Sequence, residues 1–180
     1  MIAEEMMETI QAETLAATRT RHILVIGMGN RHRHDDQVGL YVAHRLRERN
    51  LDPAVQIVKE DGDILDLLDS WQGADVIFLV DAVCSGAEAG TIHRFKIGND
   101  VGCDEIIPQN LFLYSTHAFG LSEVVLLAQS LGKLPRRLLV YGIEGADFDM
   151  GEGLTLNVLG AAEQVVEEIA SHIRSIDDRR

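Results

Sequence analysis

The sequence predicts an α/β fold, a three-layer α/β/α sandwich around a twisted, mostly parallel sheet. Two observations lead to this prediction. Short apolar runs without polar alternation recur along the chain, as in strands that are buried on both faces. Between them lie segments whose apolar residues recur at helical spacing. The length of 180 residues suits one domain, which we place at residues 23–176, after an N-terminal arm at 1–22.

The apolar runs define the strands in chain order. Strands are expected at residues 23–26, 55–58, 76–80 and 138–143, with a strand near the sheet edge at 91–95. The run at 76–80 is expected to end at Asp81, the first polar residue after it.

Helical spacing defines the segments between the strands. Helices are expected at residues 38–46, 63–71, 120–131 and 155–176. Asp63 and Thr155 are placed as N-caps, because their side-chain oxygens can accept hydrogen bonds from the first turn. Strands that alternate with helices are typical of a parallel sheet covered on both faces.

Charge and cysteine content exclude several classes of protein. The net charge of −13 disfavours nucleic acid as a partner. Cys84 and Cys103 form no CxxC pair, so we expect reduced thiols and a cytoplasmic protein. The acidic N-terminus does not resemble a signal peptide, and no apolar stretch approaches the roughly 20 residues of a membrane span.

Polar side chains stand at three places in the sequence that are suited to ligand binding. Asp35 and Asp36 come after the first strand, Asp81 ends the third, and His117 precedes the helix at 120–131. Ligands of open α/β sheets bind beyond the carboxyl ends of the strands, so these groups could meet in one crevice. Two carboxylates and one imidazole suit a divalent ion such as Ni²⁺ or Zn²⁺.

Each of these residues also has a structural interpretation. Asp36 could cap the helix that begins near Val38, and Asp81 could be a turn residue. His117 alone could be a core histidine with its hydrogen bonds satisfied. Spacing in the sequence does not decide between these alternatives.

Other motifs are weaker. Gly27 and Gly29 resemble the start of a dinucleotide fingerprint, but His32 stands where its third glycine would be. His32 and His34 could attract a metal, although a solvated cationic loop explains them better. Cys84 has no base beside it, and no Ser-His-Asp or Cys-His signature indicates a covalent nucleophile.

Taken together, the ordered motifs of residues 23–170 resemble the hydrogenase maturation proteases. These endopeptidases trim the C-terminus of the large subunit of [NiFe] hydrogenase. The matching segments are Ile23-Leu24-Val25-Ile26-Gly27-Met28-Gly29-Asn30, Asp35-Asp36-Gln37-Val38-Gly39, Val80-Asp81-Ala82-Val83, Ser85-Gly86, Gly90-Thr91, Ser115-Thr116-His117-Ala118-Phe119-Gly120-Leu121, Tyr141-Gly142-Ile143-Glu144 and Gly151-Glu152-Gly153-Leu154-Thr155.

The resemblance implies the same three-layer fold and a set of site residues. The family's nickel-binding positions fall on Asp36, Asp81 and His117, and we expect Asp36 and Asp81 to be the catalytic residues. The implied ion is Ni²⁺ supplied by the substrate, with Zn²⁺ or another divalent ion possible in vitro. The implied partner is the large-subunit precursor, with no nucleic acid and no membrane, and the implied oligomeric state is a monomer.

Three details of the sequence depart from the family pattern. Gln37 stands where the family commonly has glycine, and a Gly-Thr-x-Gly run is replaced at residues 62–65. The charged loop at residues 31–34 replaces mostly apolar residues, and we expect it to contact the precursor.

The mechanism and the class of function each keep an alternative. The ion could polarise the scissile carbonyl or activate a water with Asp36 or Asp35 as base, or nickel could serve only for recognition while an unliganded acid acts. The competing functions are a non-hydrolytic nickel-recognition or assembly factor on the same fold and an α/β nucleotide enzyme that uses residues 27–30.

Overall fold

The computed structural model describes residues 21–60, 68–98 and 121–177. Within these residues the elements are β1 (Ile23–Met28), the 3-10 helix η1 (His34–Gln37), α2 (Val38–Arg47), β2 (Val55–Glu60), β3 (Val76–Val83), β4 (Ile92–Ile97), α4 (Leu121–Ser130), β5 (Arg137–Glu144) and α5 (Leu156–Asp177). The strands form one sheet in the order β2-β1-β3-β5-β4. β2, β1, β3 and β5 run parallel, and only the edge strand β4 is antiparallel to its neighbour.

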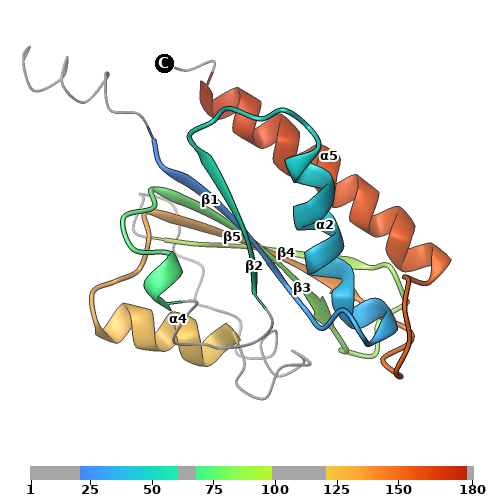
Figure 1. The fold of residues 1–180 in the computed structure, drawn as a ribbon. Helices are drawn as coiled ribbons and strands as arrows, with labels where there is room; N and C mark the ends of the chain where they lie inside the picture. Colours follow the sequence, from blue (N-terminus) through green and yellow to red (C-terminus); the bar gives the residue numbers. More distant parts are fainter. Residues whose placement is uncertain (1–20, 61–67, 99–120, 178–180) are drawn as a thin grey trace, which may run out of the picture.

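Helices cover both faces of this twisted sheet. α2 and α5 lie on one face and α4 lies on the other (Figure 1). The predicted three-layer α/β/α sandwich with a mostly parallel sheet is therefore confirmed. None of the helices in the described segments is both long enough and apolar enough to cross a bilayer.

Each face of the sheet has its own core, because successive side chains of a strand point to opposite faces. Val25 and Phe78 pack toward α2 and α5, whereas Leu24 and Ile77 pack toward α4. All residues of β1 and the first seven of β3 are buried. This burial explains why both strands read as continuous apolar runs rather than as alternating patterns.

Two glycines allow α2 to approach the sheet closely. A Cβ atom on Gly27 would overlap the carbonyl oxygen of Gly39, and a Cβ atom on Gly39 would overlap the carbonyl oxygens of Met28 and Val80. The first turn of α2 therefore lies directly over the ends of β1 and β3. Gly27, which resembled part of a nucleotide fingerprint, is accounted for by this packing.

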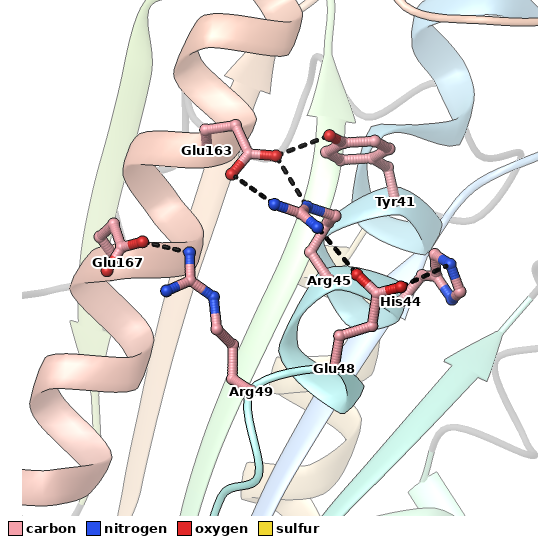
Figure 2. Close-up of polar contacts among 7 residues, drawn as sticks. All are labelled: Tyr41, His44, Arg45, Glu48, Arg49, Glu163 and Glu167. Carbon is pink, nitrogen blue, oxygen red and sulfur yellow. Dashed lines mark hydrogen bonds and ion pairs between the residues drawn. The ribbon is translucent and has the colours of Figure 1, made fainter.

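Charged side chains join α2 to α5 on the outer surface (Figure 2). The Glu163 carboxylate accepts hydrogen bonds from Tyr41 Oη at 2.6 Å and from Arg45 Nε at 2.8 Å. These bonds lower the pKa of Glu163, since they stabilise its charged form. Arg49 forms a second ion pair with Glu167. The two helices on this face are thus linked by polar contacts as well as by their shared core.

The structure extends several predicted strands and leaves two predicted segments partly outside its range. β1, β2 and β4 each continue two residues beyond their expected ends. β3 continues to Val83, so Asp81 lies inside the strand instead of ending it. Of the helix expected at 63–71, residues 68–70 are helical, whereas its predicted cap Asp63 lies outside the described residues. Most of the expected N-terminal arm, residues 1–20, also lies outside them, so the arm and the single-domain boundary stay predictions.

Candidate active site

Two buried aspartates lie at the carboxyl edge of the sheet. Asp36 belongs to η1 after β1 and is 3% exposed, and Asp81 lies near the end of β3 and is also 3% exposed. η1 contacts β3, and the backbone of Gly39 rests on the carbonyl oxygen of Val80. Asp36 and Asp81 therefore flank one contact between the start of α2 and the end of β3. The structure brings these two predicted site residues to the same edge.

The backbone around Asp36 is fixed by Gly29. Gly29 has a φ of +145°, and a Cβ atom there would overlap the Asp36 carbonyl oxygen. That oxygen accepts a hydrogen bond from Asn30 N at 3.3 Å, and Asp36 N donates to Arg33 O at 2.8 Å. The turn from β1 into η1 thus depends on a glycine that no other residue can replace without moving Asp36.

The capping interpretation of Asp36 is wrong. The N-cap of α2 is Gln37 rather than Asp36, and Gln37 forms no side-chain capping hydrogen bond. The turn interpretation of Asp81 is wrong as well, because Asp81 is paired with Gly142 inside the parallel ladder of β3 and β5. Asp81 Oδ1 accepts a hydrogen bond from Ala82 N at 2.8 Å. A buried carboxylate within a strand is rare unless it is paired or binds a cation.

Asp35 has a different role from its neighbour. Its side chain is fully buried and accepts four hydrogen bonds from the segment that joins β5 to α5. The donors are the backbone nitrogens of Ala146, Asp147 and Thr155, at 2.7–2.9 Å, and the Thr155 hydroxyl at 2.9 Å. A carboxylate engaged in this way is unsuited to take a proton from water. Asp35 is therefore a structural residue, and Thr155, placed correctly before α5, uses its hydroxyl to bind it.

Glu144 was not predicted as a functional residue, although it occupies a similar position on the other side of Asp81. It ends β5, is 1% exposed, and accepts hydrogen bonds from Ser85 N at 2.7 Å, Ser85 Oγ at 2.7 Å and Gly86 N at 2.8 Å. His93 Nε2 lies 3.4 Å from the same carboxylate. The signal in the sequence was an acidic residue directly after an apolar strand, the same signal that singled out Asp81.

The third predicted ligand, His117, lies outside the described residues. Within the described ranges, no group of three or more His, Cys, Asp or Glu side chains is arranged to hold a metal ion. Asp36 and Asp81 are the predicted ligands that lie at this edge, and carboxylate oxygens are hard ligands suited to a divalent cation. A nitrogen ligand such as His117 would complete the predicted set.

The remaining candidates contribute to the fold of nearby loops. His34 is partly buried, with Nδ1 3.3 Å from Gly153 O and Nε2 3.9 Å from Asp147 Oδ2. His34 therefore packs on the segment before α5 instead of standing in solvent, whereas His32 is exposed as expected. Cys84 is an exposed free thiol.

The fold and these acids define the class of α/β proteins to which the chain belongs. The chain is an α/β sandwich whose parallel strands present two buried aspartates at the carboxyl edge, where such sheets bind ligands.

Comparison with known proteins identifies the family. The family model for hydrogenase maturation proteases matches residues 40–172. The chain is 32% identical to the hydrogenase expression/formation protein HupD of Thiocapsa roseopersicina over 71% of its length, a match that spans 56% of that relative. It is 27% identical to the hydrogenase 2 maturation protease of Escherichia coli, over 84% of this chain and 90% of that protein.

Solved structures agree with the fold. The hydrogenase maturating endopeptidase HybD of Escherichia coli superposes with a TM-score of 0.66 at 24% identity, over 87% of this chain and 93% of that chain. A [NiFe] hydrogenase maturation protease from Thermococcus kodakarensis superposes with a TM-score of 0.64 at 22% identity, over 84% and 99%. The chain belongs to the hydrogenase maturation protease family, and it is an enzyme of the peptidase class.

Proposed function

We propose that this protein is an endopeptidase that removes a C-terminal peptide from the nickel-loaded large-subunit precursor of a [NiFe] hydrogenase. Asp36, Asp81 and His117 are proposed to recognise the nickel that the precursor carries. Membership of the family supports the reaction class. The observation that carries the site assignment is that Asp36 and Asp81, distant in sequence, are both buried at one edge of the sheet.

The two neighbouring acids, Asp35 and Asp36, differ in their hydrogen bonds, and this difference limits which residue can act as the general base. Asp35 is saturated by hydrogen bonds from residues 146–155, so the base that deprotonates water is Asp36 or Asp81 rather than Asp35. A nickel ion in the precursor would supply Lewis acidity near the scissile carbonyl. The carboxylates of this chain would bind that ion, orient the precursor and accept a proton.

Substitution at Asp81 tests the proposal. The side chain of Asp81→Asn keeps the oxygen that accepts from Ala82 N, so the fold should survive. The loss of the negative charge should abolish processing, because an amide is both a weak ligand and a poor base. Intact-mass analysis of the nickel-loaded precursor after incubation with wild type, Asp81→Asn and His117→Ala gives the readout.

A matched control uses an acid away from the edge. Asp69 is exposed and accepts a hydrogen bond from Gln72, and Asp69→Asn should release the same peptide as the wild type. A folded and fully active Asp81→Asn protein would overturn the site assignment. Unchanged precursor mass with the wild type, together with tight binding of that precursor, would favour the non-hydrolytic assembly factor instead.

A further inference from the structure

Three buried side-chain nitrogens in the described residues have no hydrogen-bond partner, namely His22 Nδ1, Trp71 Nε1 and Gln37 Nε2. His22 directly precedes β1, at the amino edge of the sheet, and Trp71 belongs to the core on the side of α4. Gln37 lies at the opposite edge, as the residue after Asp36. Of these three residues, Gln37 is the one that lies next to the candidate site.

Gln37 forms no capping hydrogen bond that would offset the destabilising effect of its unpaired donor. It holds the N-cap position of α2. Asp, Asn, Ser or Thr would stabilise the helix at this position by accepting a hydrogen bond from its first turn. A buried donor without an acceptor destabilises the folded protein, and a ligand bound at the adjacent site would supply an acceptor.

The position of Gln37 suits contact with a substrate. A Cβ atom on Gly29 would lie 3.1 Å from Gln37 Cα, so the residue stands where β1, η1 and α2 meet. The residue is half-buried, so part of it still faces solvent and a change of rotamer can present its amide to a bound molecule. It also stands at the N-terminal end of the ten-residue helix α2, where partial positive charge favours an electron-rich group.

The chemistry of the proposed reaction requires such a donor. Asp36 and Asp81 supply only negative charge and hydrogen-bond acceptors when ionised. During peptide hydrolysis the carbonyl oxygen of the scissile bond gains negative charge, and a neutral N–H donor stabilises it. The amide of Gln37 is a donor of this kind on the residue next to Asp36.

We propose that Gln37 Nε2 donates a hydrogen bond to the carbonyl oxygen of the scissile peptide and stabilises the charge that develops there. This inference rests on the proposed endopeptidase function. It assigns to Gln37 a role in the transition state, so removing the amide should lower kcat and leave KM nearly unchanged.

Two variants separate this role from a structural one. Gln37→Met keeps the length of the side chain without a donor, and Gln37→Glu keeps its shape but only accepts when ionised. Each should lower kcat for precursor processing by about 100-fold. Gln37→Met should at the same time raise Tm, by about 2–6 °C, because it removes a buried unpaired donor. Gln72→Met is the matched control, since the exposed Gln72 amide donates to Asp69 and should affect neither quantity appreciably.

Gln37→Met is expected to lower kcat and to raise Tm. A residue with only a structural role would not produce this combination. A Gln37→Met protein that loses both Tm and activity, or one that processes the precursor at the wild-type rate, would overturn the inference while leaving the proposed function intact. A wild-type protein that releases no peptide from any nickel-loaded precursor would overturn both, and the uncut wild-type sample distinguishes that result from the others.

Discussion

At the scale of single residues, the adjacent aspartates Asp35 and Asp36 have different roles. Asp35 points its carboxylate at the segment before α5 and accepts four hydrogen bonds from it, whereas Asp36 lies toward the end of β3. The 3-10 geometry of η1 allows this divergence, because successive side chains of a helix point in different directions. A pair of acids in the sequence is thus one structural anchor and one candidate for chemistry.

Asp35→Asn is expected to destabilise the protein. The amide offers one acceptor and places an N–H₂ group against backbone N–H donors, so bonds to a charged group are lost inside the protein. The free energy of unfolding should fall by about 3 kcal/mol. Thermal or urea denaturation measures the change, with Asp149→Asn, an exposed acid in the same segment, as the control near zero. Equal stability of the two variants would contradict the anchoring role.

At the scale of secondary structure, the site depends on how closely α2 lies against the sheet. Gly39→Ala should destabilise the protein by about 3 kcal/mol, because its methyl group would overlap backbone oxygens of β1 and β3 that have no room to move. Gly160→Ala in α5 is the matched control. A Cβ atom there meets nothing within 4 Å, and alanine is the better helix former, so stability should rise by about 1 kcal/mol. Denaturant titration checks both, and a neutral Gly39→Ala would contradict the close contact.

The polar link between α2 and α5 makes stability depend on pH (Figure 2). Arg45 and Tyr41 hold the pKa of Glu163 below its usual value. A carboxyl with a lowered pKa in the folded state stabilises above the unfolded pKa, and this contribution is lost as pH falls through the folded pKa. Glu163 is partly exposed, so the effect should be about 1 kcal/mol or less.

Glu163→Gln should therefore be less stable than the wild type at pH 7, and the difference should shrink as the pH falls through the lowered pKa of Glu163. Urea titrations of both proteins from pH 7 down through this pKa give the difference in unfolding free energy. A difference that stays constant over that range would show that the charge of Glu163 does not contribute.

At the scale of the whole molecule, the sequence predicted the layers well and the loops poorly. Strands such as β1 and β5 are buried on both faces, so their continuous apolar runs identified them as strands in the sequence. The end of β3 was placed too early, because a polar residue inside a buried strand looks like the end of that strand.

The sequence predicted that Asp36 and Asp81 lie at one edge of the sheet, but it did not predict the hydrogen bonds around that edge. Acids after strands indicated Asp36 and Asp81, since the carboxyl ends of parallel strands share one edge. The partners of Asp35 are 111–120 residues away in sequence, and those of Glu144 are 51–59 residues away. No local pattern encodes such contacts, so sequence reasoning left Asp35 open as a base and gave Glu144 no role.

The measurement that tests the central claim most directly compares one precursor in two states. The hydrogenase large-subunit precursor, prepared with and without nickel, is incubated with the wild-type protein, and its intact mass is followed over time. We predict loss of one discrete C-terminal peptide from the nickel-loaded form only. Equal cleavage of both forms would contradict nickel recognition by Asp36, Asp81 and His117, and no cleavage of either form would contradict the proposed endopeptidase itself.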